Sequence, residues 1–315
     1  MEFKTAAVIG TGMMGPGIAH SLAMGGLHTT ILSRSMENAE NARERARAWT
    51  FEEKGDENLI AASTDFDRVV ASVDLIVESA PENLAFKQDL FARLDALSRP
   101  GCVLATNTSG LSITAVQSKC RFPERTLTTH FWNPPHLMQL VEVICGAQTD
   151  PAVAASVRDL LIRCGKMPVL VKKDRPGQLG NRLQMALFRE AMYCVQEGIA
   201  NAADVDLCIM AGFGLRMPVY GALEHADMVG LELVQSLINY TLPDLYNEPH
   251  APPILAEKIA AGATGVTAGK GFYDWTVKDA AAVRARRDAF VREFTRRHSA
   301  NREPAAAHTQ TRSHV

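Results

Sequence analysis

Two histidines and a glutamate lie close together in the stretch HFWNPPHLMQLVEV, which covers residues 130–143. Apolar runs on either side of its Asn-Pro-Pro corner predict two strands, so Glu142 in the second strand can fold back beside His130 in the first. A carboxylate beside a histidine fixes the tautomer of the ring and stabilises the imidazolium that forms on protonation. The pattern therefore predicts that His130 and Glu142 form a general base, with a purely structural ion pair as the alternative. His136, beyond the two prolines, is interpreted as a loop residue or part of a substrate pocket.

The elements that must position this pair form a regular series. Before about residue 175, short apolar runs alternate with helical patterns, which is typical of βαβ units and of a mostly parallel sheet with covered faces. Later segments with the apolar spacing of helices cover residues 178–200, 204–213, 225–241 and 278–297. The predicted fold class is α/β with a second, all-helical domain. We expect the α/β domain at 1–176, the helical domain at 177–298 and a disordered tail at 299–315.

The first strand runs directly into a glycine-rich turn, VIGTGMMGPG, after which a helical pattern begins. In a G-x-G-x-x-G turn, the first glycine permits the tight turn and the second lets the backbone approach a pyrophosphate. The third lets the helix pack on the strand, and the helix N-terminus binds the phosphates. The spacing predicts a Rossmann-type dinucleotide site, with a merely structural turn as the alternative. The candidate cofactor contacts are Gly10, Gly12, Met13, Met14 and Gly15.

The end of the second strand bears on the choice of cofactor. An NAD site places an acidic residue there to bind the ribose 2′-hydroxyl, whereas this chain has Ser33 followed by Arg34. A serine and an arginine can bind a 2′-phosphate, and no carboxylate is present to repel it. The cofactor is therefore expected to be NAD or NADP, and Ser33–Arg34 somewhat favours NADP. The alternative is a solvated polar loop that tolerates NAD.

Polar residues also follow the next two strands, in VDLIVESAPEN and CVLATNTSG. Ligands of open α/β sheets bind at the carboxyl ends of the strands. The candidate cofactor contacts of this group are Ala80, Glu82, Lys87 and Asn107, and Ser109 lies at the same edge. Ordinary turn residues and solvated helix-start residues are the alternative interpretation.

Composition narrows the classes of protein. The chain has 315 residues, 47% hydrophobic residues and a net charge of −2, which fits a globular protein and argues against a nucleic-acid partner. No apolar run is long enough for a membrane span and the first residues lack a leader pattern, so a cytoplasmic location is expected. The cysteines show no metal-ligand spacing, so no metal site is expected. The basic segment VRARRDAFVREFTRR is interpreted as a solvated helix.

Several longer segments resemble the 3-hydroxyacyl-CoA dehydrogenase family. They are GTGMMGPGIAHSLAMGG, ESAPENLAFKQDLF, TNTSGLSIT, HFWNPPHLMQLVEV, VKKDRPGQLGNRLQMALFREA, EHADMVGLEL and GKGFYDW, and they follow one another in the family's order. The resemblance runs from about Ala6 to Trp275. It implies a Rossmann-type domain followed by a helical domain that mediates homodimer formation.

The resemblance also implies roles for individual residues. His130 matches the catalytic histidine and Glu142 its partner, while Ser109 and Asn181 match the polar groups that hold the substrate oxygens. The positions around the nicotinamide half of the cofactor are matched by Glu82, Lys87 and Asn107. The implied reaction interconverts a secondary hydroxyl and a ketone with NAD or NADP, on a 3-hydroxyacyl-CoA or a related hydroxycarboxylate.

One segment departs from the acyl-CoA members of that family. Their long helical arm after the second strand, rich in Lys and Ser, reaches CoA, and only SMENAENARERARAWTFEEKGDENLIAA occupies its place here. In this respect the chain is similar to the branches of the lambda-crystallin or L-gulonate dehydrogenases and of a pyridine-carboxylate dehydrogenase. A free hydroxy acid or a hydroxyalkyl-aromatic acid is therefore an alternative substrate. An alternative of another class is a catalytically silent, crystallin-like nucleotide-binding protein.

Overall fold

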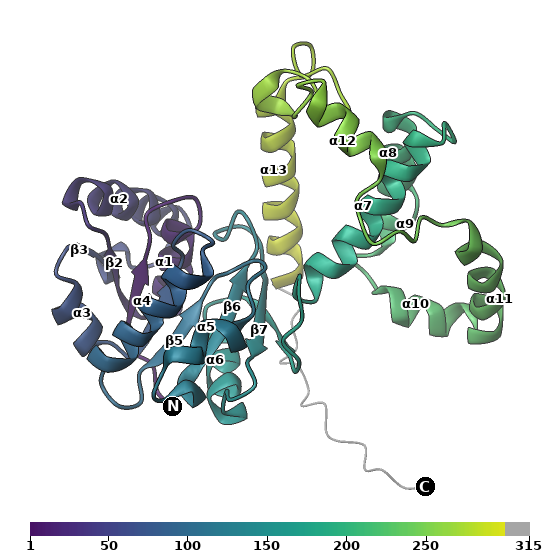
Figure 1. The fold of residues 1–315 in the computed structure, drawn as a ribbon. Helices are drawn as coiled ribbons and strands as arrows, with labels where there is room; N and C mark the ends of the chain where they lie inside the picture. Colours follow the sequence, from purple (N-terminus) through teal and green to yellow (C-terminus); the bar gives the residue numbers. More distant parts are fainter. Residues whose placement is uncertain (300–315) are drawn as a thin grey trace, which may run out of the picture. The chain divides into compact units, whose positions relative to one another are not determined.

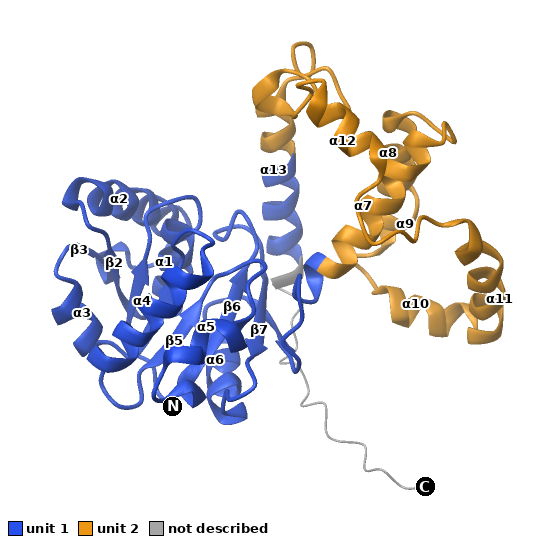
Figure 2. Cartoon of the chain, in the orientation of Figure 1, with its two compact units in different colours: residues 1–181, 287–315 blue, residues 182–286 orange. Residues whose placement is uncertain are grey.

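A computed structural model describes residues 1–299 of the chain, the last two by their helical backbone alone (Figure 1). The chain divides into two compact units (Figure 2). One holds residues 1–181 and the described residues from 287 onward, and the other holds residues 182–286. Helices α7 (Gly180–Gln196) and α13 (Ala280–Ser299) each contribute residues to both units. The expected tail at 299–315 lies outside the described residues, apart from residue 299.

The first unit is built on an eight-stranded sheet of order β3-β2-β1-β4-β5-β6-β7-β8. The strands are β1 (Thr5–Ile9), β2 (His28–Leu32), β3 (Ile60–Ser63), β4 (Leu75–Glu78), β5 (Val103–Thr106), β6 (Thr126–Phe131), β7 (Leu140–Cys145) and β8 (Met167–Val171). Strands β1 to β6 are parallel, β7 runs antiparallel to β6, and β8 is parallel to β7. The predicted mostly parallel sheet is confirmed. Its one reversal, between β6 and β7, brings the second strand of the histidine stretch back along the first.

Helices cover both faces of this sheet (Figure 1). One face packs against α1 (Gly15–Met24), α2 (Met36–Glu52) and α6 (Pro151–Arg163), and the other against α3 (Phe66–Ser72), α4 (Leu84–Leu97) and α5 (Ile113–Val116). Successive side chains of a strand point to opposite faces of the sheet, so each strand contributes to the apolar cores on both faces. Ala6 and Val8 belong to one core and Ala7 to the other. Strands buried on both faces explain the continuous apolar runs in the sequence.

The second unit is helical, as predicted. Besides its parts of α7 and α13 it contains α8 (Ala202–Ala211), α9 (Phe213–Arg216), α10 (Ala222–Val229), α11 (Leu231–Thr241) and α12 (Pro253–Ala260). The single helix expected at 225–241 is wrong, because Gly230 separates α10 from α11 with a φ of 101°. That backbone angle is incompatible with a right-handed helix and is adopted readily only by glycine.

Side chains of the second unit are poorly buried. Within residues 182–286, all of which are described, only Tyr246 and Pro252 are buried. Large apolar side chains are exposed along its helices, including Leu223 and Met228 on α10 and Leu233, Leu237 and Ile238 on α11. This unit therefore lacks an apolar core comparable to those of the first unit.

Candidate active site

The predicted pair of His130 and Glu142 is assembled by the β6–β7 reversal. The two residues are direct cross-strand partners, and Nδ1 of the histidine lies 2.8 Å from Oε2 of the glutamate. Both side chains are buried. An ionised carboxylate can only accept hydrogen bonds, so Nδ1 carries the hydrogen of the neutral ring. The opposite nitrogen, Nε2, has no hydrogen-bond partner in the described part of the chain and is left as the acceptor for a substrate proton.

Glu142 is held in its ionised form by four donors. Oε2 accepts from His130 and from Nε1 of Trp132 at 3.1 Å, and Oε1 accepts from the amides of Leu179 and Gly180 at 2.8 Å each. Burial opposes ionisation, but the hydrogen bonds outweigh it and lower the pKa of Glu142 below its ordinary value. The carboxylate is therefore a fixed negative charge that can stabilise the protonated form of His130.

Two further predicted residues meet beside this pair. Asn181, in the first turn of α7, donates from Nδ2 to the main-chain oxygen of Ser109 at 3.1 Å. The preceding amides of Leu179 and Gly180 bind Glu142, so the start of α7 connects the loop after β5 with the His130 pair. The structure thus brings all four predicted catalytic residues to one edge of the sheet, from four separate segments.

Asn107 joins the ends of β5 and β6. Its Oδ1 accepts from the amide of Phe131, the residue after His130, at 2.8 Å. Its Nδ2 lies 3.5 Å from the hydroxyl of Ser79 at the end of β4. The side chain is buried, so it fixes the relative positions of the strand ends that would border a nicotinamide ring.

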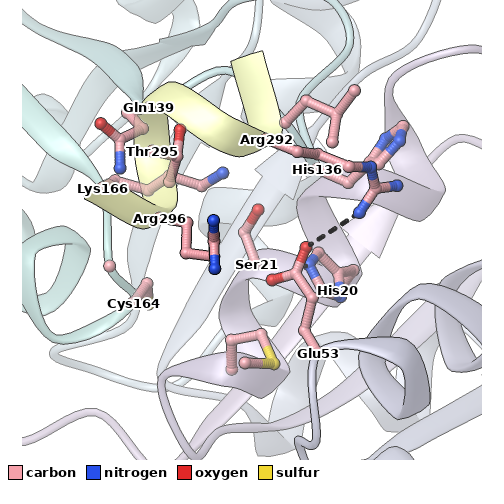
Figure 3. A pocket seen from close by; sticks show the side chains of 13 residues that line it. His20, Ser21, Glu53, His136, Gln139, Cys164, Lys166, Arg292, Thr295 and Arg296 are labelled. Carbon is pink, nitrogen blue, oxygen red and sulfur yellow. Dashed lines mark ion pairs between the residues drawn. The ribbon is translucent and has the colours of Figure 1, made fainter. Parts of the chain in front are cut away.

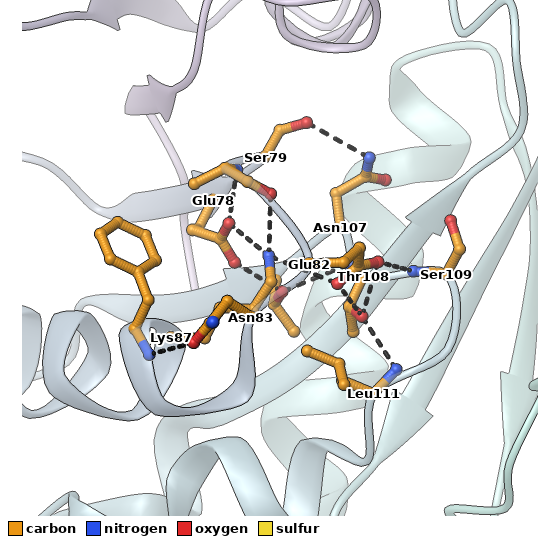
Figure 4. Close-up of polar contacts among 12 residues, drawn as sticks. Glu78, Ser79, Glu82, Asn83, Lys87, Asn107, Thr108, Ser109 and Leu111 are labelled. Atoms are coloured by element: carbon orange, nitrogen blue, oxygen red, sulfur yellow. Dashed lines mark hydrogen bonds and ion pairs between the residues drawn. The ribbon is translucent and has the colours of Figure 1, made fainter.

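A buried polar cluster lies at the end of β4 (Figure 4). Oε1 of Glu78 accepts from Nζ of Lys87 and from the amide of Ala80 at 2.5 Å each, and Oε2 accepts from Thr106 at 2.6 Å. Lys87 is only 1% exposed and also donates to the carbonyl of Ala80 at 3.2 Å. Each charge is compensated, as burial requires. The cluster fixes the backbone at Ala80, and cofactor contact by Ala80 and Lys87 stays a prediction.

Glu82 shapes the loop that carries Ser109 (Figure 4). Its carboxylate accepts from the hydroxyl of Thr108 at 2.8 and 2.9 Å and from the amide of Ser109 at 2.7 Å. The negative charge is partly balanced by Nζ of Lys87, 3.8 Å away. Glu82 therefore positions a predicted catalytic residue, and its predicted contact with the nicotinamide half of a cofactor remains a prediction.

The glycine turn has the shape that a dinucleotide needs. Gly10 has a φ of 121°, and a Cβ there would lie 2.5 Å from the carbonyl oxygen of Ser79. A Cβ at Gly15 would overlap the carbonyl of Gly10, whereas a Cβ at Gly12 would meet no atom within 4 Å. The first and third glycines are thus required by the protein itself. The open space at Gly12 fits a phosphate that approaches the backbone before α1 begins.

Ser33 and Arg34 differ in how firmly they are held. The hydroxyl of Ser33 accepts from the amide of Ser35, whose own hydroxyl accepts from Asn38 at the start of α2. Arg34 is exposed and makes no hydrogen bond or ion pair within residues 1–299. Its guanidinium is therefore available to an anionic ligand at the end of β2.

Sequence reasoning missed Trp132 and Glu78. Trp132 lies two residues after His130, and residues two apart along an extended chain project to the same side, so the alternation of β6 could have identified it. Glu78 is a carboxylate in a buried apolar strand, the signal that identified Glu142. His136, by contrast, stacks on Trp49 with ring centroids 3.9 Å apart and lines a cavity that does not include His130.

Within residues 1–299, no three or more His, Cys, Asp or Glu side chains are grouped as metal ligands. In the same span, no helix is long and apolar enough to cross a membrane.

Two family models match consecutive parts of the chain. The model described as 3-hydroxyacyl-CoA dehydrogenase, NAD binding domain, matches residues 5–175. The model described as 3-hydroxyacyl-CoA dehydrogenase, C-terminal domain, matches residues 177–275.

Named relatives and a solved structure match over most of the chain. A 5-formyl-3-hydroxy-2-methylpyridine 4-carboxylate 5-dehydrogenase of Mesorhizobium japonicum is 35% identical over 90% of this chain and 94% of its own. A probable 3-hydroxybutyryl-CoA dehydrogenase of Bacillus subtilis is 34% identical over 88% and 99%. The crystal structure of a 5-formyl-3-hydroxy-2-methylpyridine 4-carboxylic acid 5-dehydrogenase, described as an NAD+ dependent dismutase, superimposes with a TM-score of 0.86. It is 33% identical and covers 96% of this chain and 100% of its own.

Proposed function

We propose a reaction for this chain, which belongs to the 3-hydroxyacyl-CoA dehydrogenase family and is an NAD-dependent oxidoreductase acting on CH–OH groups. It interconverts a hydroxyl and a carbonyl group on a small substrate, with His130 as general base. The observation that carries the proposal is the His130–Glu142 pair, in which Nδ1 is occupied by a fixed carboxylate and Nε2 is left to accept a proton.

In the direction of oxidation, Nε2 of His130 takes the proton of the substrate hydroxyl. Glu142 stabilises the imidazolium that forms, and the amides of Leu179 and Gly180 keep that carboxylate charged. Ser109 and Asn181 orient the substrate oxygens beside His130. The nicotinamide cofactor, when bound, supplies hydride transfer. In the direction of reduction, His130 returns the proton to the new hydroxyl oxygen.

Our substrate proposal favours a carboxylate without CoA over a CoA thioester. The segment after β2 forms α2, which ends at Glu52. A short connection then leads into β3, which begins at Ile60, so no separate helical arm projects beyond the sheet. The match to the pyridine-carboxylate dehydrogenase over nearly its whole length also supports a small acid. A 3-hydroxyacyl-CoA is the second candidate, supported by the relatives named for 3-hydroxybutyryl-CoA.

We also propose that NADP(H) is accepted as well as NAD(H). The end of β2 offers Ser33 and Arg34, whose guanidinium has no partner among residues 1–299, and a planar guanidinium binds phosphate oxygens well. No carboxylate follows Leu32 until Glu37, which lies in the first turn of α2. A 2′-phosphate at this position would therefore meet a cation and hydroxyl donors.

We further infer that two chains associate through the second unit. Leu233 and Leu237, one helical turn apart on α11, are 53% and 56% exposed, and Leu223 on α10 is 84% exposed. Exposed apolar surface of this extent marks a protein–protein interface. A second copy of the same helices would cover it in an isologous homodimer.

Two assays test the reaction. Titration of the purified protein with NADH and NADPH should show saturable binding of both, and no binding of either would contradict the assignment. Turnover is then measured with acetoacetyl-CoA, with free 3-hydroxy and 3-oxo acids, and with hydroxyalkyl and formyl derivatives of pyridine carboxylates. Turnover of free acids alone supports the non-CoA proposal, whereas efficient turnover of the thioester alone would replace it with the second candidate.

A further inference from the structure

Figure 3 shows a cavity of the first unit, and none of the predicted catalytic residues lines it. Its volume is about 360 Å³. It is lined by the second half of α1, the residue after α2, the β6–β7 connection, the turn between α6 and β8, and the end of α13. Neither the glycine turn nor His130, Ser109 or Asn181 belongs to the lining. The cavity is therefore separate from the proposed cofactor and substrate positions.

Lys166 places an ammonium group at this cavity without a carboxylate partner. Its Nζ donates to the carbonyl oxygens of Pro135 at 2.6 Å and Met138 at 3.1 Å. The residue is 6% exposed, and no carboxylate of residues 1–299 lies within ion-pair distance of it. Burial lowers the pKa of Lys166 to about 8, because removing the ammonium group from water disfavours its charged form. Two carbonyl dipoles therefore stabilise this ammonium group, and the charge of Glu53 acts on it only from beyond ion-pair distance.

Two arginines of α13 add further positive charge. Arg292 and Arg296 line the cavity together with Lys166, while Glu53 is the only acidic residue of the lining among the described residues. Glu53 is shared, since it lies 3.9 Å from Arg292 and 3.6 Å from Nε2 of His20. Arg292 also lies 3.8 Å from Glu52 and Arg296 pairs with Glu293, and neither of these two glutamates is part of the lining. Three cations thus face one carboxylate that already has two partners.

His136 contributes an unused polar atom. Its Nδ1 is buried and has no hydrogen-bond partner among the described residues. Burial, reinforced by the nearby cations Arg292 and Lys166, lowers the pKa of His136 to about 4, so the ring is neutral at pH 7. A neutral imidazole can donate from this nitrogen to an anion without adding charge.

We propose that this cavity binds a small anion of the phosphate type, either inorganic phosphate or the phosphate group of a small ester. The volume suffices for such a ligand, since small-molecule sites begin near about 300 Å³. Phosphate oxygens can accept from an ammonium group and from arginines at the same time. Because Arg292 and Arg296 lie on α13 and Lys166 lies after α6, a bound anion would join the end of α13 to the face formed by α1 and α6.

Calorimetric titration of the full chain with inorganic phosphate and with glycerol phosphate tests the proposal. The cofactor is present at a saturating concentration, so that phosphate binding at the glycine turn does not contribute. The ionic strength is kept constant, and a titration with chloride serves as the reference for non-specific anion binding. One saturable site per chain is expected. Preference for one of the two ligands then distinguishes free phosphate from an ester.

Matched arginine variants make the assignment specific. Arg296→Gln should weaken phosphate binding by about threefold to tenfold, the effect of one charge-assisted contact. Arg297→Gln is the control, because Arg297 is equally exposed, adjacent and paired with the same Glu293, yet it does not line the cavity. Lys166→Met should abolish binding. Equal effects of the two arginine variants, or the absence of a saturable phosphate site, would overturn the proposal. Cofactor binding is measured separately, so this outcome is distinguishable from a failure of the proposed function.

Discussion

The two units of the chain are stabilised in different ways. The first has an apolar core on each face of its sheet, and the buried charges of Glu78 and Lys87 pair with each other. The second, at residues 182–286, buries only Tyr246 and Pro252 while Leu223 and Leu237 remain exposed. A unit without a core of its own depends on a partner for apolar burial. The difference agrees with our proposals that the first unit carries the chemistry and that the second associates with another copy of the chain.

The largest expected effect on stability is in the core of the first unit. Phe91, on α4, is completely buried. Phe91→Ala should lower the free energy of unfolding by about 3–5 kcal/mol, because it removes buried apolar surface and leaves a cavity. Leu223→Ala, at an 84% exposed position, should cost less than about 0.5 kcal/mol in dilute protein. Denaturant titration measures both, and equal losses would break the contrast between the units.

Association of the second unit is expected to respond to charge on α11. Leu233→Asp combined with Leu237→Asp should weaken self-association by at least about tenfold, since each carboxylate would be desolvated at the interface. Analytical ultracentrifugation measures the change. Phe51→Asp, at a position 70% exposed in the first unit, is the control and should leave the molar mass unchanged. A double variant that associates like the unchanged chain would show that α11 is not the interface.

Acid stability should distinguish His136 from Glu142. The folded-state pKa of His136 is lowered to about 4 from an ordinary value of 6.5, so the unfolded chain binds more protons between these values. Stability is therefore lost as the pH falls from 6.5 towards 4. His136→Phe, which can still stack on Trp49, should reduce this loss by about 1 kcal/mol after allowance for partial exposure. Glu142, whose pKa is lowered from 4.5, keeps its full contribution above about pH 4.5 and loses it only as the pH falls below that value. Thermal unfolding across pH tests this, and an unchanged slope in the variant would contradict it.

A smaller effect is expected at the cofactor position. Arg34→Gln should weaken NADPH binding by about fivefold and alter NADH binding by less than about twofold, because only the 2′-phosphate is expected to contact the guanidinium. Fluorescence titration provides both values. Lys119→Gln, which removes an exposed cation paired with Asp89, is the control for a general change in charge. Equal losses for the two nucleotides would show that Arg34 does not recognise the 2′-phosphate.

Some features of the fold were predictable because they follow local periodicity. Alternating apolar runs and helical patterns indicated the sheet, and the carboxylate inside the apolar run of β7 indicated a partner for Glu142. The break at Gly230 was not predicted, because an isolated glycine is tolerated inside many helices and only its backbone angle reveals the break.

Other features depend on residues far apart in the chain. The cavity at Lys166 combines α1 with Arg296 of α13, which no local pattern connects. The four donors to Glu142 likewise come partly from Leu179 and Gly180, whose main-chain amides carry no sequence signal. The pairing of His130 with Glu142 could therefore be predicted from side-chain chemistry, whereas the main-chain partners of Glu142 required the fold.

The most direct test measures the turnover number and the cofactor affinity of two variants, His130→Ala and His136→Phe, and compares them with those of the unchanged chain. Removing a general base typically costs about two to four powers of ten in turnover. We expect that loss for His130→Ala, with cofactor affinity unchanged within about twofold, because the glycine turn is built from other segments. His136→Phe should keep its turnover within about twofold of the unchanged chain. Near-normal turnover of His130→Ala would contradict the assignment of His130 as the base.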